Sequence, residues 1–502
     1  MLVSEFLLQI HPDDNVAVAV TNIQSGQRVT AGGQHITVRE EIPRGHKVAL
    51  RHISESDLIV KYGYPIGHAT QPIERGAWVH THNVKTNLSG KIDYEFRGPQ
   101  RTILTGNSSE KIPREFHGYV RENGDVGIRN EIWIINTVGC INKTAERLAA
   151  LAGSRYQALG VDGVYHFPHP YGCSQLGDDL LYTQRLLAAL ARHPNAAGVL
   201  VIGLGCENNQ LSDFLPMIGP DNTKRVKYMA VQSVDDEFDE GLRLLDELAE
   251  YASTFKRTVV PVSKLKIGLK CGGSDAFSGI TANPLVGQFS DLLVAAGGTS
   301  LLTEVPEMFG AETILMDRAR DDETFDDIVH LINNFKDYYV RHGQVIYENP
   351  SPGNKDGGIT TLEEKSLGCV QKGGNAPVSG VLQYGEPVQS PGLQLVQAPG
   401  NDMVSVTALI AAGAHMVLFT TGRGTPMGGA APTLKISTNS DLCERKPHWI
   451  DFDAGRMMRG EDVNSLAVDL FAKVISVASG GKTKNEENGF REIAIFKDGV
   501  TL

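Results

Sequence analysis

The first 95 residues alternate apolar and polar positions over short runs that glycine and proline interrupt. Apolar positions recur with a period of two in the segments 16–20, 35–39, 47–53 and 57–66. Because successive side chains of a strand point to opposite faces, this period predicts short β-strands with one buried face. Helical periodicity is absent here, so we expect a small all-β domain over residues 1–95.

From Gly118 onward the pattern changes to apolar runs of strand length separated by amphipathic runs of helical length. An apolar run at 131–138, for example, precedes a helical pattern at 142–159. Strands that alternate with helices predict βαβ units and a parallel sheet. The expected fold class is therefore α/β, with a small all-β domain followed by Rossmann-like parallel-sheet domains.

The same changes of pattern predict domain boundaries. We expect a polar linker at 96–116, an α/β catalytic domain at 117–375 and a C-terminal α/β domain at 376–502. The segment 348–374 is rich in glycine and proline and predicts a long loop. A loop of that length in a compact domain is usually functional or disordered.

Composition and charge limit the classes of partner. With 41% hydrophobic and 21% charged residues, the 502-residue chain predicts folded domains with sizeable cores. Its formal net charge of −12 argues against nucleic acid or an anionic membrane as a partner, and an acidic substrate would need locally placed positive groups.

Secretory and membrane-spanning patterns are absent and cysteines number six, so we expect a cytoplasmic protein with free thiols. A homo-oligomer, by default a dimer, is expected.

Three Gly-Cys pairs follow predicted buried strands at a constant spacing of 33 residues. Their cysteines are Cys140, Cys173 and Cys206, and Cys271 and Cys369 lie in similar contexts. Because ligands of open α/β sheets bind at the carboxyl ends of strands, these five thiols are candidate metal ligands around one crevice. The alternative is structural, since a free cysteine is often a small buried apolar residue. CxxC pairs are absent, which argues against a structural zinc site.

Polar residues follow several of these cysteines directly, where a bound ligand would satisfy them. The candidate substrate-binding residues in these loops are Ser174, Gln175, Glu207, Asn208, Ser274 and Asp275. Ordinary turns are the alternative for each loop taken alone. The segment 203–208 also resembles part of a dinucleotide fingerprint but lacks the third glycine, which leaves an NAD-dependent oxidoreductase as an alternative of a different class.

Two histidines of the N-terminal domain are candidate catalytic residues. His80 and His82 are two positions apart, so in a strand their imidazoles share one face, beside the candidate substrate-binding residue Asn83. We expect them to face the cysteine crevice and to help complete the site. The alternative is an exposed polar strand face.

Three cations complete the candidate catalytic set. Arg129 is a candidate clamp for a substrate carboxylate, next to the candidate binding residue Asn130, and a surface salt bridge is the alternative. Arg423 lies in a glycine-rich loop after a predicted strand, where it could bind an oxyanion. Lys365 is close to Cys369, and a lowered pKa near a metal would let it act as a base; a solvated lysine is the alternative.

Long motifs along nearly the whole chain resemble those of the altronate and galactarate dehydratase family. The resemblance depends on RGHK, KYGYPIG and VHTHN in the N-terminal region, on TVGCIN, YGCSQLGDD, VIGLGCENNQ and CGGSDAFSGITANP in the middle, and on YENPSPGNKDGGITTLEEKSLGCVQK and HWIDFDAGR towards the end. It implies that the N-terminal domain is SAF-like, with a β-clip fold. His68 is the departure, since the family pattern leads us to expect no histidine there.

The resemblance implies loss of water from a six-carbon sugar acid. The expected reaction removes the C2 proton of altronate and the C3 hydroxyl, giving 2-keto-3-deoxygluconate, with galactarate as the alternative substrate. The family is similar to iron-dependent dehydratases, which implies Fe(II), with Mn(II) as a second option. The cysteines would also permit an iron–sulfur cluster instead. A non-catalytic binding protein is the alternative that the SAF-like domain leaves open.

Overall fold

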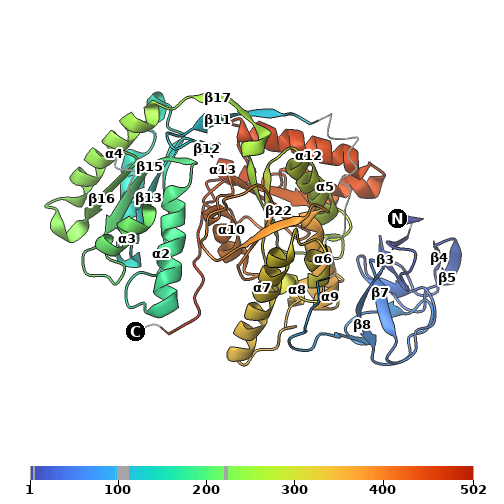
Figure 1. Ribbon diagram of the computed structural model, residues 1–502. Helices are drawn as coiled ribbons and strands as arrows, with labels where there is room; N and C mark the ends of the chain where they lie inside the picture. The colour runs from blue at the N-terminus through green and yellow to red at the C-terminus, as the bar shows by residue number, and fades with distance from the viewer. Residues whose placement is uncertain (1, 4–5, 97, 99–111, 220–223, 501–502) are drawn as a thin grey trace.

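The structure is a computed structural model that describes residues 2–3, 6–96, 98, 112–219 and 224–500. It has three parts along the chain: a small β-rich domain, a middle α/β domain and a third, larger α/β domain (Figure 1). In Figure 1 the blue N-terminal domain lies at the right, against the third domain, and the green middle domain lies at the left. This arrangement confirms the predicted fold class.

The N-terminal domain consists of short antiparallel strands, as the period of two predicts. One sheet has the order β1-β2-β3-β6-β9, a second has the order β10-β8-β7, and β4 pairs with β5. The strands are β1 (Leu2–Val3), β2 (Leu7–Gln9), β3 (Val16–Ala19), β4 (Arg28–Ala31), β5 (Gln34–Thr37), β6 (Lys47–Ala49), β7 (Leu58–Lys61), β8 (Tyr64–Ala69), β9 (Trp78–Val79) and β10 (Val84–Lys85).

The middle domain is a four-stranded parallel sheet with helices on both faces. Its order is β14-β13-β15-β16, from β13 (Glu131–Asn136), β14 (Gly163–His166), β15 (Ala196–Gly203) and β16 (Val226–Ala230). Helices α1 (Asn142–Ala152) and α4 (Glu237–Ser253) cover one face, and α2 (Gly177–Arg192) and α3 (Leu211–Ile218) cover the other. Successive residues of β13 point to opposite faces, so Ile134 packs with the first pair of helices and Trp133 with the second.

A small antiparallel sheet joins the middle domain to the third. It has the order β12-β11-β17, with β11 (Glu115–Val120), β12 (Val126–Gly127) and β17 (Arg257–Pro261). Strand β11 enters the middle domain and β17 leaves it, so the two crossings of the chain are hydrogen-bonded side by side.

The third domain is built on a seven-stranded sheet of order β20-β21-β19-β18-β22-β23-β24, in which every pairing is parallel. The strands are β18 (Lys266–Cys271), β19 (Thr299–Leu302), β20 (Val378–Leu382), β21 (Gly392–Val396), β22 (Met416–Thr421), β23 (Thr433–Ser437) and β24 (Phe452–Asp453). All residues of β21, β22 and β23 are buried, because helices cover both faces of the sheet.

The helices of this domain include two short ones within the segment that the sequence predicts as a long loop. They are α5 (Ala282–Ala295), α6 (Glu312–Met316), α7 (Asp322–Arg341), α8 (Pro352–Asp356), α9 (Leu362–Cys369), α10 (Asp402–Ala411), α11 (Ser440–Arg445), α12 (Val463–Ala478) and α13 (Lys484–Glu487). Every residue of α9 is buried, including its charged ones. Among the described residues, no helix combines the length and apolarity needed to cross a membrane.

Two predicted boundaries differ from the structure. The boundary at 375/376 falls inside the seven-stranded sheet, because β20 follows it directly and pairs with β21 beside β19. Most of the predicted linker at 96–116 lies outside the described residues, and its last two residues begin β11.

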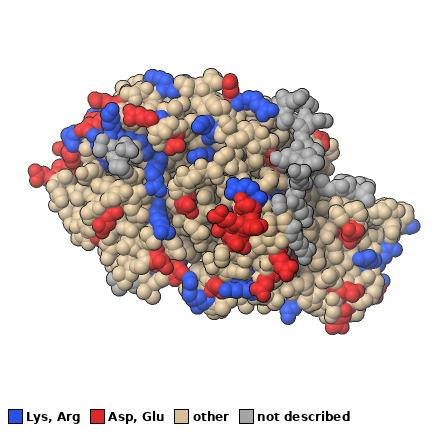
Figure 2. Space-filling view, viewed as in Figure 1, with Lys and Arg blue, Asp and Glu red and all other residues tan. Residues whose placement is uncertain are grey.

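On the face drawn in Figure 2, acidic and basic side chains form small groups of both signs, and much of the surface is uncharged.

Candidate active site

The carboxyl ends of the central strands of the seven-stranded sheet carry a dense group of charged and sulfur-containing side chains. Strand β18 ends at Cys271, with Lys270 just before it, and the chain after β19 holds Glu304 and Glu307. The two strands are parallel neighbours, so these residues meet at one edge of the sheet. Helix α9 ends at Cys369, which contacts the same group. Since ligands of open α/β sheets bind at this edge, it is the candidate active site.

Cys271, Cys369 and Glu307 form a buried group of donors that could hold a metal ion, since their ligand atoms all lie within 4.8 Å of one another. The two sulfurs are 3.3 Å apart, and Glu307 Oε2 lies 3.1 Å from the Cys369 sulfur and 3.7 Å from the Cys271 sulfur. Helix α9 positions Cys369 by its C-terminal turn. We call these three residues the buried ligand group.

Lys270 and Lys372 surround Glu304 on one side of this group. The Lys372 ammonium lies 2.9 Å from the Cys271 sulfur and 3.1 Å from Glu304 Oε2, and Lys270 also contacts Glu304. Glu304 has a φ of 73°, in the left-handed region that only a few non-glycine residues adopt. This backbone conformation is held where a carboxylate must meet two buried ammonium groups, as is typical of functional sites.

The electrostatics of the group favour a Cys271 thiolate. A hydrogen bond with Cys369 and the charge of Lys372 lower the pKa of the Cys271 thiol, although burial acts to raise it. For Cys369 the partner thiolate and burial raise the pKa of the thiol. Burial raises the pKa of the Glu304 carboxyl. The two thiols therefore differ in charge, with Cys271 as the anion.

Lys365 occupies the other side of the buried ligand group. Its ammonium lies 2.8 Å from Glu307 Oε1 and 3.0 Å from Asn349 Oδ1. Burial acts to lower the pKa of Lys365, but the Glu307 carboxylate outweighs it, so the pKa is raised. The predicted lowered pKa depends on a nearby metal ion, and it stays a prediction.

The loops after β18, β22 and β23 also lie at this edge of the sheet, and they carry Asp275, Arg423 and Thr438. The Asp275 carboxylate accepts hydrogen bonds from the hydroxyls of Ser278, at 3.2 Å, and Thr438, at 3.1 Å, and burial raises the pKa of Asp275. Arg423 is exposed and donates one hydrogen bond, of 2.9 Å, to the carbonyl of Gly353. Arg423 is thus an available cation at the rim.

A very small cavity of about 10 Å³, roughly the size of one water molecule, lies between the N-terminal domain and this site. Lys61 and Tyr62 line it from the N-terminal domain, and Ser274, Asp275, Lys365 and Cys369 line it from the third domain. The structure therefore places these four predicted site residues of the third domain beside the N-terminal domain.

The N-terminal domain is attached to α9 by a buried ion triad of Lys47, Lys61 and Glu364. The Glu364 carboxylate lies 2.9 Å from Lys47 Nζ and 2.7 Å from Lys61 Nζ, and all three side chains are at most 1% exposed. Burial acts to raise the pKa of Glu364, but the two lysines outweigh it and lower the pKa to about 2. Because Glu364 and Cys369 belong to the same short helix, the triad fixes the position of a residue of the buried ligand group.

The two predicted histidines lie at the domain contact, but in a turn rather than a strand. Strand β9 ends at Val79, and the amides of Asn83 and Val84 donate to the His80 carbonyl. Both rings pack on Trp78: that of His80 is stacked with an interplanar angle of 5°, and that of exposed His82 is tilted. The side chain of Asn83 closes the turn, accepting from the His80 amide and donating to the Trp78 carbonyl.

Only the first of these histidines reaches the third domain. His80 Nδ1 lies 3.1 Å from Thr360 Oγ1, just before α9. Burial, followed by the charge of Lys47, lowers the pKa of His80 to about 3, so its ring is neutral near pH 7. A catalytic role for His80 and His82 stays a prediction.

The five predicted cysteine ligands fall into two sets on different sheets. Cys271 and Cys369 are buried at the seven-stranded sheet, whereas Cys140, Cys173 and Cys206 are exposed after β13, β14 and β15 of the middle domain. The sequence pattern places each thiol at a strand end or in a glycine-flanked loop but cannot say which sheet a strand joins. The prediction of one shared crevice is therefore replaced by two thiol sites.

The polar residues predicted beside the exposed thiols mostly shape their loops. Glu207 accepts hydrogen bonds from the amides of Leu204 and Gly205 and from the Thr137 hydroxyl. The Asn208 side chain accepts from the Ser174 amide at 2.7 Å. Gln175 Oε1 accepts from the Gly172 amide, while its Nε2 is buried without a partner.

Arg129 and Asn130 are structural in this fold. The Arg129 guanidinium donates to both oxygens of Glu486 and to the carbonyls of Ile128, Val477 and Gly481, which uses all five of its N–H groups. Asn130 is fully buried and bonds to Arg121, Gly160 and Ala252. Arg129 thus has no donor left for a substrate carboxylate.

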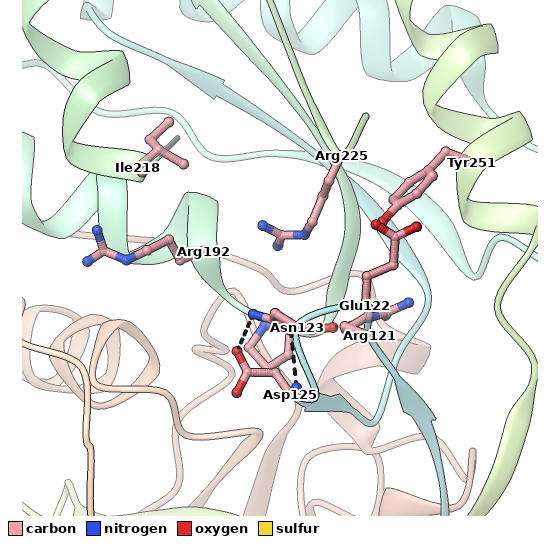
Figure 3. A pocket seen from close by; sticks show the side chains of 10 residues that line it. Arg121, Glu122, Asn123, Asp125, Arg192, Ile218, Arg225 and Tyr251 are labelled. Atoms are coloured by element: carbon pink, nitrogen blue, oxygen red, sulfur yellow. Dashed lines mark hydrogen bonds between the residues drawn. The ribbon is translucent and has the colours of Figure 1, made fainter. Parts of the chain in front are cut away.

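A separate pocket of about 270 Å³ lies at the amino ends of the middle sheet, opposite the exposed thiols (Figure 3). Arg225 in its wall donates to the carbonyls of Ala191, His193 and Ala196, and Arg121 donates to that of Pro194. Figure 3 shows Asn123 and Asp125 bonded to each other at its mouth. These arginines satisfy the carbonyls between the end of α2 and the start of β15, which is a structural role.

Four charged residues of the site are missed by the sequence reasoning: Lys270, Glu304, Glu307 and Lys372. One signal was available, because Lys270 stands in an otherwise apolar buried strand, one residue before a cysteine. A buried charge needs a partner, so this lysine indicates carboxylates at the same strand end. Glu304 and Glu307 carry no such signal, since the lysines that pair with them come from other parts of the chain.

Comparison with known proteins covers all three domains. The family described as "Altronate/galactarate dehydratase SAF domain" matches residues 5–87, "D-galactarate dehydratase/Altronate hydrolase, second domain" matches 118–253, and "D-galactarate/Altronate dehydratase, C-terminal" matches 262–501.

Relatives match over nearly the full length. The chain is 54% identical to altronate dehydratase of Bacillus subtilis (strain 168) and 51% identical to altronate dehydratase of Escherichia coli (strain K12), each over 99% of both chains. Galactarate dehydratase (L-threo-forming) of Escherichia coli (strain K12) is 33% identical, over 98% of this chain and 96% of that one. The protein belongs to the altronate and galactarate dehydratase family.

Proposed function

We propose that the protein dehydrates altronate to 2-keto-3-deoxygluconate. The observation that carries the proposal is the identity of 54% and 51% to two altronate dehydratases over 99% of the chain, against 33% for the galactarate dehydratase. In the reaction the C2–H bond and the C3–O bond break, water leaves, and the resulting enol tautomerises to the keto acid. The protein is thus a hydro-lyase of sugar-acid catabolism.

The chain supplies positive charge where this chemistry needs it. Loss of the C2 proton adds negative charge to a group that already carries a carboxylate, so fixed cations stabilise the transition state. An ammonium has three donors, and Lys365 uses two of them on Glu307 and Asn349. Its third donor makes no hydrogen bond among the described residues, so it is available for a substrate oxygen. These local cations offset the net charge of −12.

The buried ligand group would hold the divalent ion that the family resemblance implies. Two of its three donors are thiols, and thiolates select thiophilic ions, so Fe(II) fits this donor set better than Mn(II), which prefers oxygen ligands. To admit an ion, Lys372 has to release the Cys271 sulfur, 2.9 Å away. When bound, a divalent ion acts as a Lewis acid towards substrate oxygens.

The substrate assignment is tested with purified protein and a panel of aldonic and aldaric acids. Assays with Fe(II) under reducing conditions, without added nicotinamide cofactor, should give keto acid from altronate, with a kcat/KM at least about tenfold above that for galactarate. A tenfold ratio corresponds to about 1.4 kcal/mol of transition-state binding. Preference for galactarate, or a requirement for NAD, would contradict the proposal.

Arg423→Ala should raise the KM for altronate by about 10-fold or more and leave kcat less affected. Arg423 is exposed at the rim of the crevice and donates one hydrogen bond to the Gly353 carbonyl. The other N–H groups of its guanidinium can therefore bind a carboxylate. Its removal should change the free energy of unfolding by less than about 0.5 kcal/mol. The matched control is Arg459→Ala, an exposed arginine paired with Glu444. An unchanged KM for Arg423→Ala would show that Arg423 does not bind the substrate.

We further propose that the protein acts in the cytoplasm as a homo-oligomer. All six cysteines are free thiols, which supports a reducing compartment. Sedimentation at working concentration measures the oligomeric state directly.

A further inference from the structure

Three exposed thiols of the middle domain are not used by the buried site. Cys140, Cys173 and Cys206 are exposed, whereas a free cysteine is usually among the most buried residues of a protein. Each of the three follows the carboxyl end of a different strand of the four-stranded parallel sheet. These three residues are called the exposed thiol group.

The register of the sheet places the three cysteines in loops that leave the same edge of the sheet. Asn136 of β13 pairs with Ile202 of β15, and Cys140 and Cys206 each follow their paired residue by the same number of positions. Strand β14 pairs with β13 on the other side, so Cys173 is on the neighbouring loop. The three strands are neighbours in the order β14-β13-β15, so the loops that carry the thiols are neighbours at this edge.

Hydrogen bonds tie the three loops together. The Gly139 amide donates to the Tyr171 carbonyl at 2.8 Å, which joins the Cys140 loop to the Cys173 loop. The Asn209 amide donates to the Gly172 carbonyl at 3.0 Å, which joins the Cys206 loop to the Cys173 loop. Gly172 has a φ of 101°, and a Cβ there would lie 2.0 Å from the Thr137 carbonyl oxygen, so only glycine fits this approach.

Unpartnered polar atoms concentrate at the same loops. Asn136 Oδ1, Gln175 Nε2 and Asn209 Oδ1 are buried without a hydrogen-bond partner, and these side chains are at most 3% exposed. Each residue is within four positions of a cysteine of the exposed thiol group. Buried polar atoms are normally satisfied, so three exceptions beside three exposed thiols indicate a ligand.

We propose that the exposed thiol group holds an iron–sulfur cluster, with one iron left free of protein ligands. A single tetrahedral ion needs its sulfurs roughly 3.8 Å apart, given metal–sulfur bonds of about 2.3 Å. The three sulfurs do not all lie within 4.8 Å of one another in the part of the chain that the structure describes. Thiolates that bind different irons of one cluster are spaced more widely, and three of them leave a fourth iron open.

The test uses the full-length protein, purified anaerobically and reconstituted with Fe(II) and sulfide. Acid-labile sulfide, bound iron and visible absorbance are measured without substrate, so the result is independent of dehydratase activity. Wild-type protein should hold about four sulfides per chain. Cys140→Ser, Cys173→Ser and Cys206→Ser should each lose at least about 90% of the sulfide, since each removes one of only three protein ligands.

Two further variants separate this site from the buried one. Cys443→Ser, a partly exposed cysteine of α11, should keep the full sulfide content, and Cys271→Ser should keep it too because it lies on the other sheet. Wild-type protein without labile sulfide would overturn the proposal. So would a single sulfide-free ion at these thiols, or serine variants that keep their sulfide.

Alkylation gives a second readout that needs no variant. In the reconstituted protein, mass spectrometry should find Cys140, Cys173 and Cys206 at least about 10-fold less modified by iodoacetamide than after removal of the iron with a chelator, because cluster ligation blocks the thiolate that reacts. Cys443 should be modified equally in both. Equal modification of the three exposed thiols in both states would overturn the proposal.

Discussion

Cys369→Ser will lower kcat/KM for altronate at least about 100-fold while the chain stays folded. Residues that only support metal ligands already cost 10- to 100-fold when changed, and Cys369 is itself a donor of the buried ligand group. Serine is close in size to cysteine, and its hydroxyl can donate to Glu307 Oε2, 3.1 Å from the present sulfur. The measurement is kcat/KM in anaerobic assays with Fe(II), together with iron content, counted as the iron bound per chain in excess of labile sulfide, which leaves out iron held in a cluster.

The matched control for Cys369→Ser is Cys443→Ser, which changes a cysteine of α11 outside the site. This control should keep wild-type kcat/KM and iron content. If Cys369→Ser retains more than about one tenth of wild-type kcat/KM with full iron content, the buried ligand group is not the metal site. If it loses activity but keeps its iron, Cys369 acts on the substrate instead of on the metal.

Glu364→Gln will destabilise the protein by about 3–5 kcal/mol, the cost of removing one partner from a buried ion pair. The change leaves Lys47 and Lys61 buried without a countercharge. It should also lower activity, because Glu364 holds the helix that carries Lys365 and Cys369. Urea denaturation at pH 7 measures the free energy of unfolding.

The acid sensitivity of the two proteins should differ as well. The folded-state pKa of Glu364 is about 2, below the usual carboxyl value, so its stabilisation is fully present above about pH 4.5 and is lost as pH falls towards 2. Glu364→Gln lacks this part of the acid dependence. The control Glu74→Gln, an exposed residue of the same domain, should change stability by less than about 0.5 kcal/mol. A Glu364→Gln variant as stable as this control would show that the triad contributes nothing to stability.

The regular parts of the fold could be predicted because their periodicity is strong. The alternation at 16–20 gives β3, and the apolar run at 131–138 gives β13. Helix α9 could not be predicted in this way, because all eight of its residues are buried and it has no polar face to create a period. Its mixture of glycine, charge and cysteine is typical of a loop when only local sequence is considered.

The candidate site shows the same limit. Cys271, Cys369, Lys365, Asp275 and Arg423 could be found from strand ends and glycine-flanked motifs, and the structure brings them to one crevice. The separation of the thiols into two groups could not be predicted, because local sequence patterns do not determine which sheet a strand joins. The structural role of Arg129 could not be predicted for a related reason: its partner Glu486 lies 357 positions further along the chain.

The ion triad also bears on the order in which the molecule is made. Lys47 meets a carboxylate that is 317 positions away in sequence, so the ribosome completes the first domain long before its counterpart exists. At about 5–20 residues per second, two ammonium groups stay hydrated for many seconds until α9 emerges. Docking of the first domain is therefore a late step of biogenesis, and a truncated product that ends before α9 lacks the partner that keeps this domain in place.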